Sequence, residues 1–276
     1  MKDRALGIIT GTAALIASLL LLLIMAELLR ASWPALSALT MGEWLLSGHW
    51  APADGQFGLG AMLAASLVTS LLALAIAGPA GVLLAAWLHL CAPAWVARPL
   101  RALQGVMAGI PSVVYGFWAL ITLVPLVNHW APPGAVMMTA VLILALMILP
   151  LSVLVTDAAL AQVPPRAMQA ARAMALSRWG TFRHVMWPFV RSSVASGIVL
   201  QFGRALGETM AVLMVAGNVI RWPGSLTEPV RTITANIALE MGYASGLHAQ
   251  VLFLSGLLLL VMVVVGMLVV RVGLRS

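Results

Sequence analysis

Long apolar runs alternate with short polar segments along the whole chain. Six of these runs have the length of a membrane crossing, and they cover residues 5–29, 61–88, 102–126, 135–156, 192–216 and 249–270. A helix needs about 20 consecutive, mainly apolar residues to cross the hydrocarbon core of a bilayer. The pattern therefore predicts an all-α integral membrane protein with about six transmembrane helices.

The composition excludes a soluble globular domain. Of the 276 residues, 62% are hydrophobic and 8% are charged, whereas soluble domains average about 25% charged residues. The first apolar run follows Lys2 and Arg4 as in a signal peptide, but it is longer than the roughly 7–15 apolar residues of a signal, and no A-x-A cleavage site follows closely. We interpret this run as an uncleaved helix.

Several functional classes are excluded by residues that the chain lacks. Lys2 is the single lysine, and it is in no position to complete a phosphate-binding P-loop. Cys91 is the single cysteine, and no histidine has another histidine three or four residues away, so we expect no metal site and no cofactor. The net charge of +7 and the pI near 11.3 do not indicate a nucleic-acid partner, because the basic residues lie between apolar spans.

Six alternating crossings divide the basic residues unequally between two sides. One side carries eleven of them, at Lys2, Arg4, Arg98, Arg101, Arg166, Arg172, Arg178, Arg183, Arg191, Arg271 and Arg275. The other side carries three, at Arg30, Arg221 and Arg231. Since Lys and Arg accumulate in cytoplasmic loops, both termini are predicted to be cytoplasmic and segments 31–60 and 217–248 to lie outside.

Two connecting segments are long enough to form structure of their own. The outer segment 31–60 contains three tryptophans, Trp33, Trp44 and Trp50, with several Gly and Pro residues. Because tryptophan favours the membrane interface, we expect an ordered cap or hairpin there. The inner segment 157–191 carries five arginines, and it predicts short helices parallel to the membrane, on which a partner could dock.

The third predicted span contains a proline between two glycines, in the run Ala108–Gly116. Proline inside a helix removes a hydrogen bond and clashes with the preceding turn, so a kink is expected near Pro111. The freed backbone groups, together with the Ser112 and Tyr115 hydroxyls, could line a polar path. A simple packing kink at a helix crossing is an equally good interpretation.

The fifth predicted span contains charged residues, in the run Gly203–Val212 (GRALGETMAV). Arg204 and Glu208 are four residues apart and would share a helix face. Gly203 and Gly207 would permit another helix to approach closely. An intramembrane arginine costs about 2.5–3.5 kcal/mol at the centre of a span, so we favour a translocation pathway over a structural ion pair.

The inner segment resembles the cytoplasmic loop of ABC importer membrane subunits, which carries Glu-Ala-Ala, then a Gly, then Leu-Pro. This chain has Gln169, Ala170 and Ala171, then Ala175, and finally Trp187 and Pro188. The resemblance implies that the loop docks on a cytoplasmic ATPase, with small side chains allowing a close seat. The alternative is an amphipathic helix whose basic residues face lipid phosphates.

A narrower resemblance covers roughly residues 60–270. The runs 108–116, 203–212, 215–218 and 231–238 are similar to the permeases of phosphate-specific ABC importers, and more to the PstC subunit than to its PstA partner. The resemblance implies a type I permease fold and a non-enzymatic transport subunit of the bacterial inner membrane that translocates phosphate. The implied partners are two ATP-binding subunits, a second PstA-like permease, a periplasmic phosphate-binding protein and membrane lipid.

From the motifs and this resemblance we select candidate site residues and a domain division. The translocation pathway is predicted to contain Arg204, Glu208, Thr209, Asn218, Ser112 and Tyr115, and ATPase coupling to involve Gln169, Ala170, Ala171, Ala175 and Pro188. Residues 1–60 would form an N-terminal transmembrane helix and periplasmic segment, and residues 61–276 the permease core.

Three other functions are compatible with parts of the pattern. One is an ABC permease for another oxyanion. Another is a proton-coupled carrier that uses Glu208 and needs no ATPase. The third is an integral-membrane enzyme, such as a lipid-phosphate transferase, for which Asp157, Glu208 and His184 are acid or base candidates but form no recognised constellation.

Overall fold

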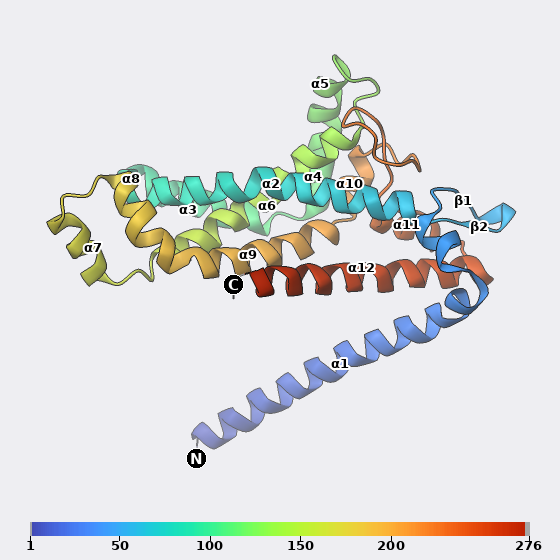
Figure 1. Cartoon of the computed structure of the whole chain (residues 1–276), viewed down its shortest axis with the longest axis horizontal. Coiled ribbons are helices and arrows are strands. Elements are labelled where there is room, and N and C mark those ends of the chain that lie inside the picture. The colour runs from blue at the N-terminus through green and yellow to red at the C-terminus, as the bar shows by residue number, and fades with distance from the viewer. Residues whose placement is uncertain (1, 274–276) are drawn as a thin grey trace.

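The structure is a computed structural model that describes residues 2–273, and it is built almost entirely of helices. Four long helices form a bundle: α2 (Gly60–Leu90), α6 (Met137–Leu160), α9 (Trp187–Leu206) and α12 (Gly246–Gly273). A fifth, α1 (Lys2–Ala38), contacts α12 near one end and then diverges from the bundle (Figure 1). Four of the six apolar runs predicted from the sequence thus become long continuous helices.

The described helices give four or five candidate membrane spans, fewer than the six predicted crossings. Within residues 2–273, four helices are long and apolar enough to cross a membrane: Ile9–Ala38, Gly60–Leu90, Met137–Leu160 and Gly246–Val269. The helix pair Ala94–Gly109 and Ser112–Asn128 is bent by 98° and passes the same test when it is counted together, as a broken span or a re-entrant loop. The predicted span 192–216 is divided between α9 and the short helix α10 (Met210–Val215).

The predicted kink at Pro111 is confirmed and is a complete break. Helix α3 (Ala94–Gly109) ends there, and α4 (Ser112–Trp118), the π-helical turn η3 (Ala119–Leu123) and α5 (Val124–Asn128) continue at a new angle. Ile110 is extended, with ψ 131°, because a following proline disfavours helical backbone. The Tyr115 hydroxyl donates to the Met107 carbonyl at 2.9 Å and so satisfies a backbone group that the break releases.

Small residues let the central helices approach closely. A side chain at Gly81 of α2 would overlap Ser152 of α6, and one at Gly197 of α9 would overlap Val155 of α6. Such positions are typical of membrane helices, whose association depends on close van der Waals packing. The largest core cluster lies where α2, α4, α6 and α10 meet, and it includes Ala73, Tyr115, Ile143, Leu144, Ile148 and Val212.

The predicted hairpin in segment 31–60 is confirmed. After a π-helical turn, η1 (Gly42–Leu46), the strands β1 (Trp50–Ala51) and β2 (Gln56–Phe57) pair antiparallel around a 3-10 turn, η2 (Pro52–Asp54). Gly55 ends this turn with φ 71°, a conformation that glycine adopts without strain. Trp44 is buried, whereas Trp33 is exposed.

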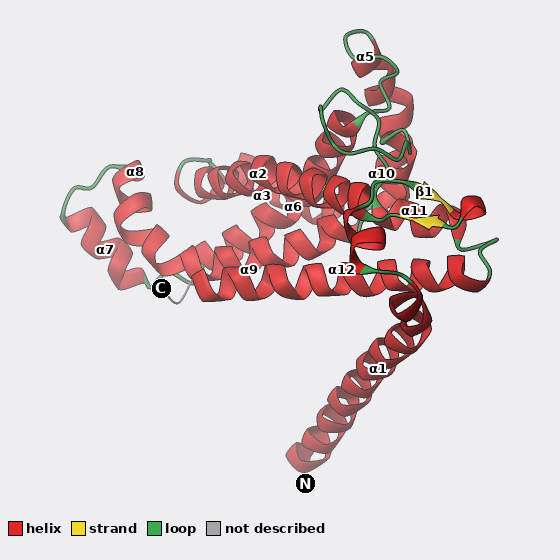
Figure 2. Cartoon of the chain, turned by 45° about the vertical axis from the view of Figure 1, so that its right-hand side comes forward, coloured by secondary structure: helices red, strands yellow, loops and turns green. Residues whose placement is uncertain are grey.

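The inner segment also forms short helices, as predicted. They are α7 (Pro165–Ala173), α8 (Arg178–Thr181) and the π-helical turn η4 (Phe182–Met186), which leads directly into α9. Figure 2 shows α7 and α8 at one end of the bundle and the two strands at the other, beside α11 (Ile233–Glu240). The two connecting segments therefore occupy opposite ends of the molecule.

Candidate functional site

The two interrupted helices lie against each other in the bundle. Helix α4, which follows the break at Pro111, packs on α10, which follows the break between Leu206 and Met210. A side chain at Gly116 would lie 2.8 Å from the Cα atom of Ala211, so only glycine permits this approach. Two segments of irregular backbone thus occur in neighbouring helices, and irregular backbone at membrane depth requires surrounding protein or water.

The break between α9 and α10 is held by local hydrogen bonds. The Glu208 carboxylate accepts a hydrogen bond from the Ala211 amide at 3.1 Å, and the Thr209 hydroxyl donates to the Gly207 carbonyl at 3.2 Å. The Thr234 hydroxyl, from α11, donates to the Glu208 carbonyl at 2.9 Å. Glu208 therefore caps the first turn of α10, as acidic residues do at helix N-termini.

The predicted pairing of Arg204 and Glu208 on one helix face is wrong. Helix α9 ends at Leu206, so the two residues do not lie one turn apart on a continuous helix. Among the described residues there is no ion pair between them, and Arg204 is exposed on the surface of the isolated chain.

Ser112 and Tyr115 lie in different surroundings at the start of α4. Tyr115 is buried, and its hydroxyl is occupied by the Met107 carbonyl. Ser112 is half-buried at the start of α4. The adjoining cavity, of about 300 Å³, is lined by apolar side chains besides Tyr115. Tyr115 thus stabilises the bend through its hydrogen bond to the Met107 carbonyl.

Asn218 closes the C-terminal end of α10. Gly217 and Asn218 have φ angles of 84° and 54°, values in the left-handed region that Gly and Asn tolerate best. The Asn218 side-chain amide donates to the Leu213 carbonyl at 2.7 Å, and the Asn218 backbone carbonyl accepts from the Arg231 guanidinium at 3.0 Å. This position therefore determines the direction of the chain after α10.

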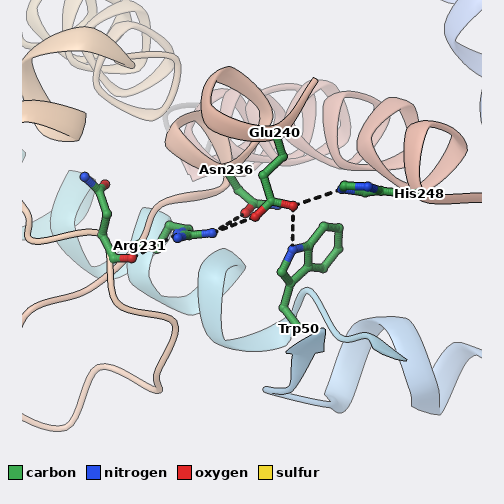
Figure 3. Close-up of polar contacts among 6 residues, drawn as sticks. Trp50, Arg231, Asn236, Glu240 and His248 are labelled. Atoms are coloured by element: carbon green, nitrogen blue, oxygen red, sulfur yellow. Dashed lines mark hydrogen bonds and ion pairs between the residues drawn. The ribbon is translucent and has the colours of Figure 1, made fainter. Parts of the chain in front are cut away.

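A buried polar cluster at the hairpin end was not identified from the sequence. Glu240 on α11 accepts hydrogen bonds from the Trp50 indole at 2.8 Å and the Arg231 guanidinium at 2.8 Å, and its carboxylate lies 2.9 Å from the His248 ring (Figure 3). Arg231 also donates to the Asn236 side chain at 3.0 Å. The cluster ties the hairpin, the segment before α11, α11 itself and α12 together.

Burial makes this cluster structurally important. The Glu240 side chain is 9% exposed and that of Arg231 18% exposed. Removing one member of a buried ion pair typically costs about 3–5 kcal/mol, because the other charge is left uncompensated. The run 231–238 gave a family resemblance, but no sequence signal could link Trp50 to Glu240, since 190 residues separate them.

A second ionic cluster lies at the opposite end. Arg101 of α3 donates two hydrogen bonds to Asp157 of α6, at 2.8 and 3.0 Å, and His89 of α2 lies 3.6 Å from the same carboxylate. A bidentate contact of this kind fixes both distance and orientation. Asp157, one of the acid candidates, therefore joins three helices.

The predicted coupling residues differ in their accessibility. Gln169, Ala170, Ala175 and Pro188 are exposed, whereas Ala171 is 2% exposed and packs into the protein. Ala171 therefore cannot contribute its side chain to an outer docking face. Within residues 2–273, moreover, no group of three or more His, Cys, Asp or Glu residues is arranged to hold a metal ion.

The end of α7 requires a left-handed backbone conformation at position 175. The Leu176 amide donates to the Ala171 carbonyl at 3.1 Å and the Ala175 amide to the Arg172 carbonyl at 3.0 Å. These two bonds form a Schellman motif, which requires a left-handed residue directly after the cap. Ala175 occupies that position with φ 49°.

Interrupted spans in a helical bundle, with short helices exposed at one end, define the fold of a multi-pass membrane protein. Solved structures support this fold. A chain of a bacterial alginate ABC transporter has a TM-score of 0.66 at 14% identity, covering 94% of this chain and 91% of that one. A chain of the MetNI methionine ABC transporter has a TM-score of 0.56 at 20% identity, covering 78% and 94%.

Sequence comparison gives the family. The family described as binding-protein-dependent transport system inner membrane component matches residues 77–274. The chain belongs to this family, and it is an inner-membrane transport subunit of the type I ABC importer permease fold, not an enzyme.

Two curated relatives illustrate this membership. The phosphate transport system permease protein PstC of Haemophilus influenzae is 33% identical over 273 residues, covering 91% of this chain and 86% of the relative. The probable ABC transporter permease protein YqgH of Bacillus subtilis is 32% identical over 235 residues, covering 83% and 76%.

Proposed function

We propose that this chain is one of two permease subunits of an ATP-driven importer that carries inorganic phosphate across the bacterial inner membrane. Relatives named as phosphate transport permeases, at 33–35% identity over most of the chain, support this substrate. The proposed partners are a second, PstA-like permease, two cytoplasmic ATP-binding subunits and a periplasmic phosphate-binding protein. ATP would be hydrolysed on the partner subunits. The pair of permeases would then open its path alternately to the two sides of the membrane.

The observation that carries the pathway proposal is the exposed Arg204 beside a break in its helix. It lies in the middle of the predicted span 192–216, where an arginine facing lipid costs about 2.5–3.5 kcal/mol. An Arg204 side chain that faces the second permease across a translocation path avoids this cost. It also offers a cation to a passing anion. Phosphate would otherwise meet a large desolvation barrier in an apolar path.

The linker 207–209 is proposed to be the moving part of this path. Glu208 and Thr209 hold it through hydrogen bonds to the Ala211 amide and the Gly207 carbonyl, and Thr234 attaches it to α11. A short linker with a few local bonds can change the angle between α9 and α10 when the ATPases close. Ser112, Tyr115 and Asn218 shape the adjacent backbone.

Substitution of Arg204 tests this function. In assembled, reconstituted complexes, Arg204→Gln should lower phosphate uptake about tenfold or more, which corresponds to about 1.4 kcal/mol of lost stabilisation at the barrier. Arg204→Lys should retain part of the uptake, because the charge is kept. The matched control is Arg191→Gln, which removes an exposed arginine nearer the start of the same helix.

The measurement is uptake of labelled phosphate, with complex abundance and basal ATP hydrolysis determined for each variant. Normal uptake by Arg204→Gln would remove Arg204 from the pathway. If the unchanged complex accumulated another oxyanion but no phosphate, the substrate assignment itself would be wrong.

The arrangement of the chain supports a proposed orientation and domain division. Figure 1 shows the N-terminus on the side of α7 and α8, and the hairpin and α11 at the opposite end. We place the arginine-rich end in the cytoplasm, with both termini. Residues 1–60 then form an N-terminal transmembrane helix and a periplasmic segment, and residues 61–276 the permease core with its coupling loop 157–191.

The outward face of α7 is the proposed contact with the ATPase. Gln169 and Ala170 are exposed there, Ala175 follows at the end of the helix, and Pro188 is exposed at the start of α9. Ala171 has a different role, because its side chain is buried on the inner side of α7.

A further inference from the structure

A groove of about 510 Å³ runs along the outside of the bundle, between α2 and the segment that leads from α8 into α9. Its volume falls within the roughly 300–1,000 Å³ of typical small-ligand sites. Nearly every side chain that lines it is apolar or aromatic, and a single arginine is the exception. The lining residues are Gly78, Pro79, Val82, Leu83, Trp179, Phe182, Arg183, Trp187 and Ile198.

Local structure keeps the groove open. The π-helical turn η4 presents Phe182 between two tryptophans, with ring centroids 5.5 Å from Trp179 and 6.1 Å from Trp187. Phe182 is buried, whereas Trp179 and Trp187 are 59% and 36% exposed. On the opposite wall, a side chain added at Gly78 would meet no atom within 4 Å. The groove is thus bounded by rigid aromatic rings and widened by a glycine.

The rim of the groove is positively charged. Arg183 is exposed and forms no ion pair or side-chain hydrogen bond with any residue in the described range 2–273. The segment 157–191 contains four further arginines and one acidic residue, Asp157. That carboxylate is already held by Arg101. An anion at the rim would therefore meet uncompensated positive charge.

The position of the groove relative to the end of α2 suits a lipid acyl chain. Leu83 lies seven residues before the end of α2 at Leu90, which is about 10 Å at the helical rise of 1.5 Å per residue. Tryptophan side chains favour the boundary between headgroups and acyl chains, and basic pockets between membrane helices bind anionic headgroups. An apolar groove whose lining includes two tryptophans and an arginine combines these features.

We propose that this groove is a binding site for an anionic phospholipid, with an acyl chain along α2 and the phosphate at Arg183. The bound lipid would connect α2 to α8 and η4, which directly follow the loop that carries α7. It would thereby stabilise the position of the coupling loop relative to the bundle. The site is separate from the proposed phosphate pathway, and its test does not depend on transport.

Photo-cross-linking tests the proposal on the assembled complex. The complex is reconstituted in nanodiscs that contain either phosphatidylglycerol or phosphatidylcholine, each with a diazirine in one acyl chain, and labelled peptides are identified by mass spectrometry. Labelling of peptides containing 78–83 and 179–187 should be about fivefold stronger with phosphatidylglycerol, as expected for one basic residue near an anionic headgroup.

Two variants and a control separate the headgroup contact from the chain contact. Arg183→Gln should abolish the preference for phosphatidylglycerol, whereas Arg178→Gln, which alters an exposed arginine of the same segment outside the groove, should preserve it. Gly78→Leu should reduce labelling by both lipids, because the new side chain fills the groove.

Three results would overturn the proposal. Equal labelling by both lipids in the unchanged complex would leave no anionic site. Loss of labelling on addition of inorganic phosphate would show that the rim binds the free ion. Absence of lipid labelling at these peptides, with a photoreactive residue at position 83 cross-linking to the second permease, would show that the groove is a protein interface.

Discussion

Ala175 is a residue whose side chain conflicts with its backbone. It has φ 49° at the end of α7, where the Schellman motif needs a left-handed residue. A Cβ atom in this region approaches the following carbonyl oxygen and costs about 1–2 kcal/mol. The chain retains the turn because two backbone hydrogen bonds depend on it.

Ala175→Gly should therefore stabilise the end of α7 by about 0.5–1 kcal/mol, since the relief of strain exceeds the added entropy of the unfolded chain. Hydrogen exchange of the Ala175 and Leu176 amides should slow by about two- to fivefold. The control is Ala173→Gly, which places glycine at a helical position and should accelerate exchange. Equal effects of the two substitutions would mean that Ala175 carries no strain.

Arg204 and Glu208 show how far residue identity predicts structure. Their chemistry in an apolar run indicated a functional segment, and that segment proved to be a break beside another broken helix. Their pairing failed because Glu208 caps α10 instead of continuing α9. Spacing of four residues predicts a shared face only where the helix is continuous.

Helix α7 has a buried side and an exposed side, and its run of small residues does not distinguish them. Ala171 is buried, whereas the adjacent Ala170 is exposed. In a stretch of four similar alanines, Ala167, Ala170, Ala171 and Ala173, hydrophobicity does not distinguish one side from the other. Only the packing of α7 against the rest of the chain determines which alanine is available to a partner.

Ala170→Trp should leave the permease inserted and folded while weakening its association with the ATP-binding subunits. A bulky side chain on the outer face prevents close approach of the partner without disturbing the core. Ala171→Trp should instead disorder the coupling loop, because its buried site has no room for the larger side chain.

The two effects are distinguished by co-purification of the ATP-binding subunits and by limited proteolysis of residues 157–191. Ala94→Trp, an exposed position at the start of α3, serves as the control for added bulk. Normal ATPase association of Ala170→Trp would make α7 a membrane-surface helix rather than a docking element.

The whole molecule has two chemically different ends. The described structure places α7 and α8 at one end and the hairpin with the Arg231–Glu240 pair at the other (Figures 1 and 2). Basic residues predominate at the first end. The proposed orientation in the membrane follows from this polarity, because basic loops remain cytoplasmic.

Thiol labelling measures this orientation with a native reporter. Cys91 is exposed between α2 and α3, so a membrane-impermeant maleimide should modify it only after the inner membrane is permeabilised. Ser225→Cys, in a Cys91→Ser background, should be modified from the outside, because Ser225 is exposed in the segment before α11. The reverse pattern of labelling would invert the proposed topology.

The sequence by itself determined the class of fold, the helical segments, the break at Pro111 and the positions of the two connecting segments. These features depend on local composition: long apolar runs favour helices in a bilayer, and Pro111 disfavours helical backbone at the residue before it. Tertiary structure alone decided which polar residues meet. The Trp50–Glu240 contact and the lipid-sized groove beside η4 each join segments distant in sequence. Packing places these segments together, and packing also decides that Ala171 is buried.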